Sequence, residues 1–147
     1  MREILFRGKT DKGEWVEGFY GQFHNRPTIN EPNIHQIFVL FTEEEEKENE
    51  GHIFSEIGGI WHTVIPETVG QYTGLTDKNG TKIFEGDIIS ISGDFKGIYT
   101  CVWEEYHFDY ELENKTMRCC LACVYSDDIK VIGNIHDNPE LLKGGAE

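Results

Sequence analysis

The stretch TDKNGTKIFEGDIISISG at residues 76–93 constrains the fold more than any other segment of the sequence. Asn79 and Gly80 both tolerate a positive φ, which a two-residue hairpin turn requires. Beyond them, isoleucines alternate with serines over 89–92, the pattern of a half-buried strand. We therefore predict that residues 76–92 form a hairpin with Asn79-Gly80 at its tip.

The rest of the chain has the same β-forming character. Ile, Val, Thr, Phe, Tyr and Trp total 51 residues, against 11 for Ala, Leu and Met together. Residues suited to a pleated surface therefore outnumber the best helix formers. Short strands punctuated by glycine, without βαβ spacing, favour a mainly β fold with an SH3-like barrel or roll and additional hairpins. Asn138, Pro139 and Gly144 carry the start and stop signals of one short C-terminal helix.

At 147 residues, the chain has the length of one domain. We expect an N-terminal β region at 1–66 and an SH3-like barrel region at 67–147. A hairpin over 2–23 and a loop over 24–33 are expected from turn residues and alternation. Further strands are expected at 34–41, 60–65, 68–75, 98–103, 106–113, 116–125 and 129–135.

Negative charge is concentrated in two segments. The chain has 13 basic and 27 acidic residues, a formal net charge of −14. Residues 43–50 (EEEEKENE) form an acidic loop or frayed helix without an apolar stripe, and 104–113 hold five more carboxylates. Such a chain is repelled by phosphate backbones, so direct nucleic-acid binding is disfavoured. A run of about 18 apolar residues is lacking, so we expect no membrane contact and residence in the cytoplasm.

Glu105, His107, Asp109 and Glu111 alternate along one predicted strand and would share a face. Carboxylates and imidazole together are the chemistry of a metal or acid–base site. Residues on one face of a strand project in parallel instead of converging, so the polar outer face of an amphipathic strand is the favoured interpretation.

Four cysteines offer a second metal hypothesis: Cys101, Cys119, Cys120 and Cys123. Cys120 and Cys123 have C-x-x-C spacing, which is found in zinc sites. Their flanks are strand-like, which would place Cys119 and Cys123 on one face and Cys120 on the other. Buried, reduced thiols are therefore favoured, and no cofactor is expected.

Three further segments carry a family resemblance: VGQYTGLTDKNGTKIFEGDII at 69–89, MREILFRGK with GEWVEGFYG near the start, and VIGNIHDNPELL at 131–142. They resemble, in this order, the signature, the opening hairpin, and the closing strand and helix of the YopX family of phage and prophage proteins. The residues of this structural motif are Tyr72, Gly74, Asn79, Gly80, Gly86 and Asp87. The resemblance implies a mostly β fold with an SH3-like element, an origin in phage or prophage genomes and residence in the host cytoplasm. It supplies no catalytic residue.

Three function classes follow. We favour a non-enzymatic homo-oligomer that acts through contacts with host or phage proteins. It would assemble through strand edges or aromatic faces, because the 18 aromatic residues exceed what one compact barrel readily covers. The alternative is an acidic decoy that imitates DNA and inhibits a host nucleic-acid enzyme. The third is a metal-dependent enzyme.

Overall fold

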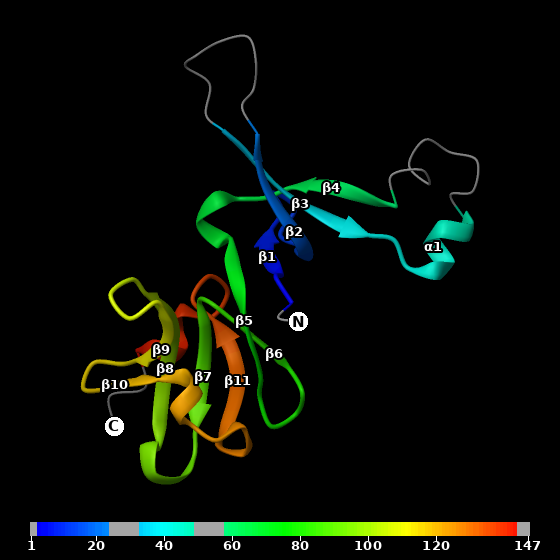
Figure 1. Ribbon diagram of the computed structural model, residues 1–147. Coiled ribbons are helices and arrows are strands. Elements are labelled where there is room, and N and C mark those ends of the chain that lie inside the picture. The colour runs from blue at the N-terminus through cyan, green and yellow to red at the C-terminus, as the bar shows by residue number, and fades with distance from the viewer. Residues whose placement is uncertain (1–2, 24–32, 49–57, 144–147) are drawn as a thin grey trace. The chain divides into compact units, whose positions relative to one another are not determined.

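The computed structural model describes residues 3–23, 33–48 and 58–143, and it confirms a mainly β chain with two antiparallel sheets (Figure 1). The chain divides into two compact units. The N-terminal unit is Ile4–Gln71, and the C-terminal unit combines Met1–Glu3 with Tyr72–Glu147. No helix in the described ranges is long and apolar enough to cross a membrane. Most of the expected loop at 24–33 lies outside these ranges.

The first antiparallel sheet has the strand order β4-β3-β2-β1-β5-β6, and the N-terminal unit contributes β4, β3, β2, β1 and the start of β5. The predicted opening hairpin and the strands at 34–41 and 60–65 are confirmed. Part of the acidic segment forms a short exposed helix, and its residues 49 and 50 lie outside the described residues. The elements are β1 Phe6–Lys9, β2 Trp15–Phe23, β3 Ile34–Leu40, α1 Glu43–Glu48, β4 Gly59–Thr63, the 3-10 helix η1 Pro66–Thr68 and the start of β5 Gly70–Thr76.

The core of the N-terminal unit is small. Among its described residues, only Ile37 and Val64 are buried hydrophobic side chains. Glycines let the backbones approach one another there, because a Cβ on Gly18 would lie 2.0 Å from the carbonyl oxygen of Phe38. This unit therefore buries little apolar side-chain surface of its own.

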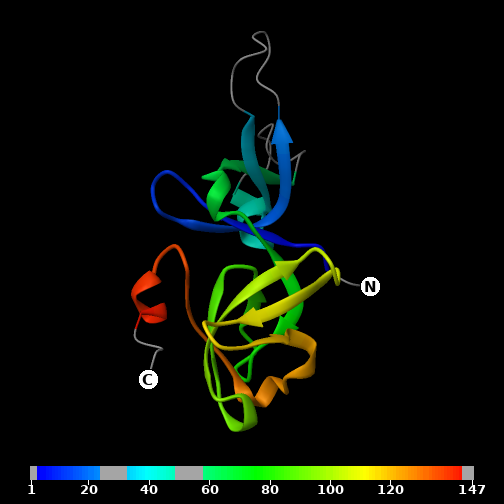
Figure 2. The same ribbon diagram turned by 90° about the vertical axis from the view of Figure 1, so that its left-hand side faces the viewer.

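The C-terminal unit contains the main hydrophobic core, which gathers Ile83, Ile89, Tyr99, Leu112 and others. Figure 2 shows the ribbon of this unit from a second direction. Its sheet has the order β10-β9-β8-β7-β11. Its strands are β6 Lys82–Phe84, β7 Asp87–Ile91, β8 Gly97–Glu104, β9 Asp109–Glu113, β10 Arg118–Cys120 and β11 Ile129–Asn134. Four 3-10 helices connect or follow them: η2 Gly93–Phe95, η3 Leu121–Cys123, η4 Ser126–Asp128 and η5 Pro139–Leu142.

Two expectations for this unit need revision. The SH3-like barrel is not confirmed, because β10 and β11 form the two edges of an open sheet in the part of the chain that the structure describes. The predicted short C-terminal helix is present as the 3-10 helix η5, but its predicted side-chain cap is not formed. Asn138 does not cap it with its side chain, which instead accepts a 3.4 Å hydrogen bond from the Asn134 N–H.

The predicted hairpin over 76–92 is wrong in its extent. The turn at Asn79-Gly80 joins β5 to β6, whereas the following strand β7 pairs with β8 and β11. Gly80 has φ +78°, but Asn79 keeps a negative φ. The Gly80 N–H donates to the Asp77 carbonyl at 2.9 Å, so the loop has three residues with glycine in the left-handed position.

Asp77 is buried at the base of this turn and ties it to β11. Its Oδ1 accepts hydrogen bonds from the N–H groups of Asn79 at 2.8 Å and Thr81 at 2.9 Å, and its Oδ2 accepts one from the N–H of Val131 at 3.0 Å. Burial opposes ionisation of the carboxyl, but these three donors outweigh it and lower the pKa of Asp77.

The remaining motif residues shape the same region. Gly74 and Gly86 both have φ +86°, where a side chain would be strained. The Asp87 carboxylate is buried and accepts the Phe84 N–H at 2.8 Å. Tyr72 is buried with its ring 5.5 Å from that of Phe84. These residues build the turn and hairpin instead of forming a reactive site.

Replacing Gly80 with Val should destabilise the protein by about 1–2 kcal/mol, because a β-branched residue is strained at positive φ. A Cβ at this position would meet no atom within 4 Å, so the effect isolates backbone strain. The measurement is urea unfolding. Gly80→Asn is the control and should be nearly neutral, since Asn tolerates this conformation. If Gly80→Val were as stable as the wild type, this result would contradict the positive φ at Gly80.

Replacing Asp77 with Ala should destabilise the protein by about 2–3 kcal/mol, because three backbone N–H groups lose a charged acceptor. Since the folded pKa of Asp77 is lowered, its contribution is fully present above the ordinary value of 3.8 and is lost as pH falls through the folded value. The difference in the free energy of unfolding between wild type and Asp77→Ala should therefore become smaller in acid. Urea unfolding at several pH values measures it. Asp94→Ala, at an exposed position, is the control.

Candidate functional site

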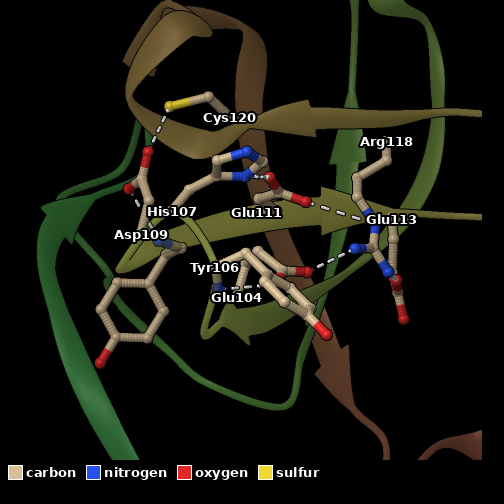
Figure 3. Close-up of polar contacts among 9 residues, drawn as sticks. Glu104, Tyr106, His107, Asp109, Glu111, Glu113, Arg118 and Cys120 are labelled. Carbon is tan, nitrogen blue, oxygen red and sulfur yellow. Dashed lines mark hydrogen bonds and ion pairs between the residues drawn. The ribbon is translucent and has the colours of Figure 1, made fainter.

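The outer face of the strands β8, β9 and β10 carries the densest polar cluster among the described residues (Figure 3). Alternation along β9 turns Tyr110 and Leu112 into the core. The carboxylates of Asp109, Glu111 and Glu113 therefore lie on the opposite face. Antiparallel pairing brings Glu104 of β8 and Arg118 of β10 beside them.

Arg118 organises three of these carboxylates. Its guanidinium pairs with Glu104 at 2.6 Å, with Glu111 at 3.3 Å and with Glu113. The hydrogen bond from Arg118 to Glu113 raises the pKa of Arg118 further. The Tyr106 N–H, and then Arg118, lower the pKa of Glu104. The charge of Arg118 thus partly neutralises these three carboxylates, which would otherwise repel one another.

The predicted strand over 106–113 is wrong at its start. Residues 105–108 form a turn and β9 begins at Asp109, so Glu105 and His107 do not continue the strand face. Phe108 has φ +53° and is the one non-glycine residue with positive φ in the described ranges. His107 still reaches the cluster, because its Nδ1 lies 3.3 Å from Glu111 Oε1.

Cys120 faces the same cluster, and its thiol donates a 2.9 Å hydrogen bond to Asp109 Oδ2. This bond, together with burial, raises the pKa of Cys120 to about 11. Burial likewise raises the pKa of Cys119, which packs against the core on the other face. Both shifts favour the thiol form over the thiolate.

The strand expected over 116–125 is also wrong at its end. β10 stops at Cys120, and Cys123 follows in the 3-10 helix η3, where it is exposed. The expectation that Cys119 and Cys123 share one strand face therefore fails. Cys101 on β8 is buried in the core, and all four cysteines are free.

The structure brings some of the candidate metal ligands near one another, and Cys120 contacts both Asp109 and Cys123. Asp109 contacts Cys120, and His107 contacts Glu111, while Glu105 lies in the turn. Within the described ranges, no group of three or more His, Cys, Asp or Glu side chains is arranged to hold a metal ion.

A second candidate surface lies on the N-terminal unit. Phe19 pairs with Phe38, and Phe38 pairs with Trp61, so a row of rings crosses the strands β2, β3 and β4. The Trp61 ring lies 5.0 Å from both the Phe38 and the Phe23 rings. Phe19 is 51% exposed and Trp61 42% exposed. We call this surface the aromatic face; its members are Phe19, Phe23, Phe38, Leu40 and Trp61.

Sequence reasoning missed Arg118 and the aromatic face. Arg118 could have been found from the hairpin between β9 and β10, which places it opposite Glu113. The alternation of Phe19, Gly21 and Phe23 indicates a common face, but alternation does not show that the face is left exposed.

Comparisons with known proteins agree on the family and the fold. A family model described as "YopX protein" matches residues 5–143. The chain is similar to a solved structure described as "Crystal structure of protein EF1440 from Enterococcus faecalis", with 23% identity and a TM-score of 0.52. That similarity covers 97% of this chain and 99% of the other, and it shows a shared fold. No curated protein matches the sequence.

We expect one fast-reacting thiol in the native protein and four after denaturation. Cys123 is exposed, whereas Cys101 is buried and the raised pKa values of Cys119 and Cys120 keep them protonated. Titration with a chromogenic disulfide at pH 8 measures this. Cys123→Ser should remove the fast phase, and Cys120→Ser should leave it unchanged. A fast phase that survives in Cys123→Ser would contradict the assignment.

Proposed function

The chain belongs to the YopX protein family, and from this premise we propose that it is a non-enzymatic assembly module that self-associates through the aromatic face. The family resemblance further supports an origin in a phage or prophage and action on host or phage proteins in the host cytoplasm. The exposed aromatic face is the observation that carries the proposal.

Burial in the N-terminal unit supports this. Of the buried hydrophobic side chains in the described ranges, only Ile37 and Val64 belong to this unit, and the other 12 belong to the C-terminal unit. Large rings remain exposed beside that small core. Exposed apolar patches of this kind mark protein interaction sites.

Charge selects a second copy of the chain as the occupant. Copies that each carry −14 repel one another over most of their surfaces. The strands β3 and β4 contain no Asp, Glu, Lys or Arg, so this repulsion is weakest where the aromatic face lies. Two copies can therefore meet over β3 and β4 without placing charged side chains of these two strands in the interface.

The outer edge of β4 offers a geometry for such contact. Among the described residues, β4 pairs only with β3 and forms an edge of its sheet. Edge strands that avoid pairing usually carry charged residues or proline, and Gly59–Thr63 has neither. The β4 strand of a second copy could pair with this edge in antiparallel orientation, with the two copies related by a twofold axis.

The alternative functions receive less support. The two acidic segments belong to different units, and Arg118 partly neutralises the one at 104–113. A decoy for nucleic-acid enzymes would depend on that charge being available. A metal-dependent enzyme would need ligands that converge, and among the residues that the structure describes no three His, Cys, Asp or Glu side chains are arranged to hold a metal ion.

Light scattering in solution tests self-association. The wild type should have at least twice the 16.9 kDa mass of one chain, and Trp61→Lys should have the mass of one chain, because a charge in the interface is costly. The matched control is Tyr125→Lys, which adds the same charge at an exposed aromatic residue of the C-terminal unit and should not alter the mass.

Salt gives an independent check. It should favour the oligomer, because the Debye length falls to about 8 Å at physiological ionic strength and repulsion between copies is screened. Circular dichroism establishes that each variant is folded. A monomeric wild type at high concentration and at both low and high salt would overturn the proposal and favour the decoy.

A further inference from the structure

Two thiols of the C-terminal unit belong to one turn of the backbone. Cys120 ends β10 and immediately precedes the 3-10 helix η3, and Cys123 is the last residue of that helix. A 3-10 helix rises about 2.0 Å per residue, so the two Cα atoms lie roughly 6 Å apart. Cα atoms joined by a disulfide are usually about 4.4–6.8 Å apart. The turn therefore fits a disulfide between Cys120 and Cys123.

The two side chains are in contact. The Cys120 thiol contacts both Asp109 and Cys123. Both cysteines are free in this structure, and Cys123 is exposed whereas Cys120 is partly buried. A small oxidant can therefore reach Cys123 first, and the thiol that would complete a disulfide is already its neighbour.

The other two cysteines are less suited to this reaction. Cys101 is fully buried in the core of the C-terminal unit. Cys119 pairs with Leu112 and packs against the same core, on the face of β10 opposite to Cys120. Cys120 is therefore the partner that the geometry favours for Cys123.

Asp109 holds the Cys120 thiol in place. That thiol donates a 2.9 Å hydrogen bond to Asp109 Oδ2 (Figure 3). The other carboxylate oxygen accepts the Tyr110 N–H at 2.7 Å, which fixes the orientation of the carboxylate. A hydrogen bond from a thiol to a carboxylate favours the thiol over the thiolate, and the thiolate is the nucleophile in disulfide exchange. Asp109 therefore slows the reaction of Cys120 without blocking it.

We propose that Cys120 and Cys123 form a reversible disulfide by exchange with a low-molecular-weight disulfide such as oxidised glutathione, and that Asp109 restrains its closure. This modification site goes beyond self-association through the aromatic face and does not depend on it, because all three residues belong to the C-terminal unit. A disulfide that includes the exposed Cys123 is open to reduction, and exposed disulfides are commonly labile and regulatory.

The reaction consists of two exchanges. The Cys123 thiolate attacks one sulfur of oxidised glutathione, forms a mixed disulfide and releases the first glutathione. Cys120 then loses its proton, attacks the Cys123 sulfur and releases the second glutathione. The two thiol protons of the protein end on the two released glutathione molecules. Two electrons thus pass from the two cysteines to one glutathione disulfide.

Closure also changes the polar cluster on the outer face of the sheet. The Cys120 sulfur no longer carries a hydrogen in the disulfide, so Asp109 Oδ2 loses the donor that it has in the reduced protein. The oxidised protein therefore presents a carboxylate oxygen there with additional acceptor capacity.

Thiol counting by mass spectrometry tests the proposal. The reduced full chain is exposed to oxidised glutathione at pH 8, quenched with acid and alkylated. The wild type should lose two of its four free thiols, keep the mass of one chain and retain no glutathione. Cys120→Ser should instead stop at the mixed disulfide on Cys123. The matched control is Cys119→Ala, which should close like the wild type.

Asp109→Asn tests the restraint on closure. Each unit by which the pKa of Cys120 falls makes its thiolate about ten times more abundant and, with a Brønsted slope of about 0.5, about three times less reactive. Asp109→Asn should therefore speed the decay of the mixed disulfide about threefold or more. Asp94→Asn removes the same charge at an exposed position and should leave the rate unchanged. Circular dichroism and urea unfolding establish that each variant is folded.

Three results would overturn the proposal. One is a wild type that retains glutathione or keeps four free thiols after prolonged exposure. Another is closure in Cys120→Ser, which would assign the bond to Cys119. The third is equal or slower closure in Asp109→Asn than in Asp94→Asn, which would remove the restraint. These measurements follow the thiols of a single chain, so they give the same answer whether or not the protein self-associates.

Discussion

The buried carboxylate of Asp77 connects parts of the C-terminal unit that are far apart in sequence. It orders the turn between β5 and β6 and also accepts a hydrogen bond from Val131 of β11, 54 positions away. A buried carboxylate without donors would be costly, so the turn and its contact with β11 support each other. The hairpin in turn carries Ile83 into the core beneath β8 and β9. The polar cluster lies on the strands β8, β9 and β10, which this core supports.

Turn chemistry and alternation are sufficient to predict most strands, but not the departures from them. Asp11-Lys12-Gly13 marks the first hairpin, and β3 is recognisable as an apolar β-branched run. The segment 105–108 contains aromatic residues in alternation and no glycine, so it has the pattern of a strand. The structure instead places Phe108 at φ +53° and begins β9 at Asp109, which no local sequence signal indicates. Likewise, no local signal distinguishes the open sheet from a closed barrel.

Several residues of the candidate site could be predicted from the sequence, but their contacts with one another could not. Alternation correctly places Asp109 and Glu111 on one face, because both lie within β9. Their partners come from other segments. Arg118 depends on the register of β10, which Asn114 helps to set by accepting the N–H groups of Thr116 and Met117 at 2.9 Å each. Contacts of this kind follow from pairing between strands, which a single sequence does not display.

The left-handed backbone at Phe108 has a consequence for engineering this protein. Because the side chain is mostly exposed and the backbone is strained, almost nothing in the folding free energy favours phenylalanine there. A library selected only for thermal resistance should therefore replace it early, most readily with glycine or asparagine. The stabilised proteins would keep their fold but lose an exposed aromatic ring from the surface of the C-terminal unit. A gain in stability would therefore remove any interaction that this ring makes.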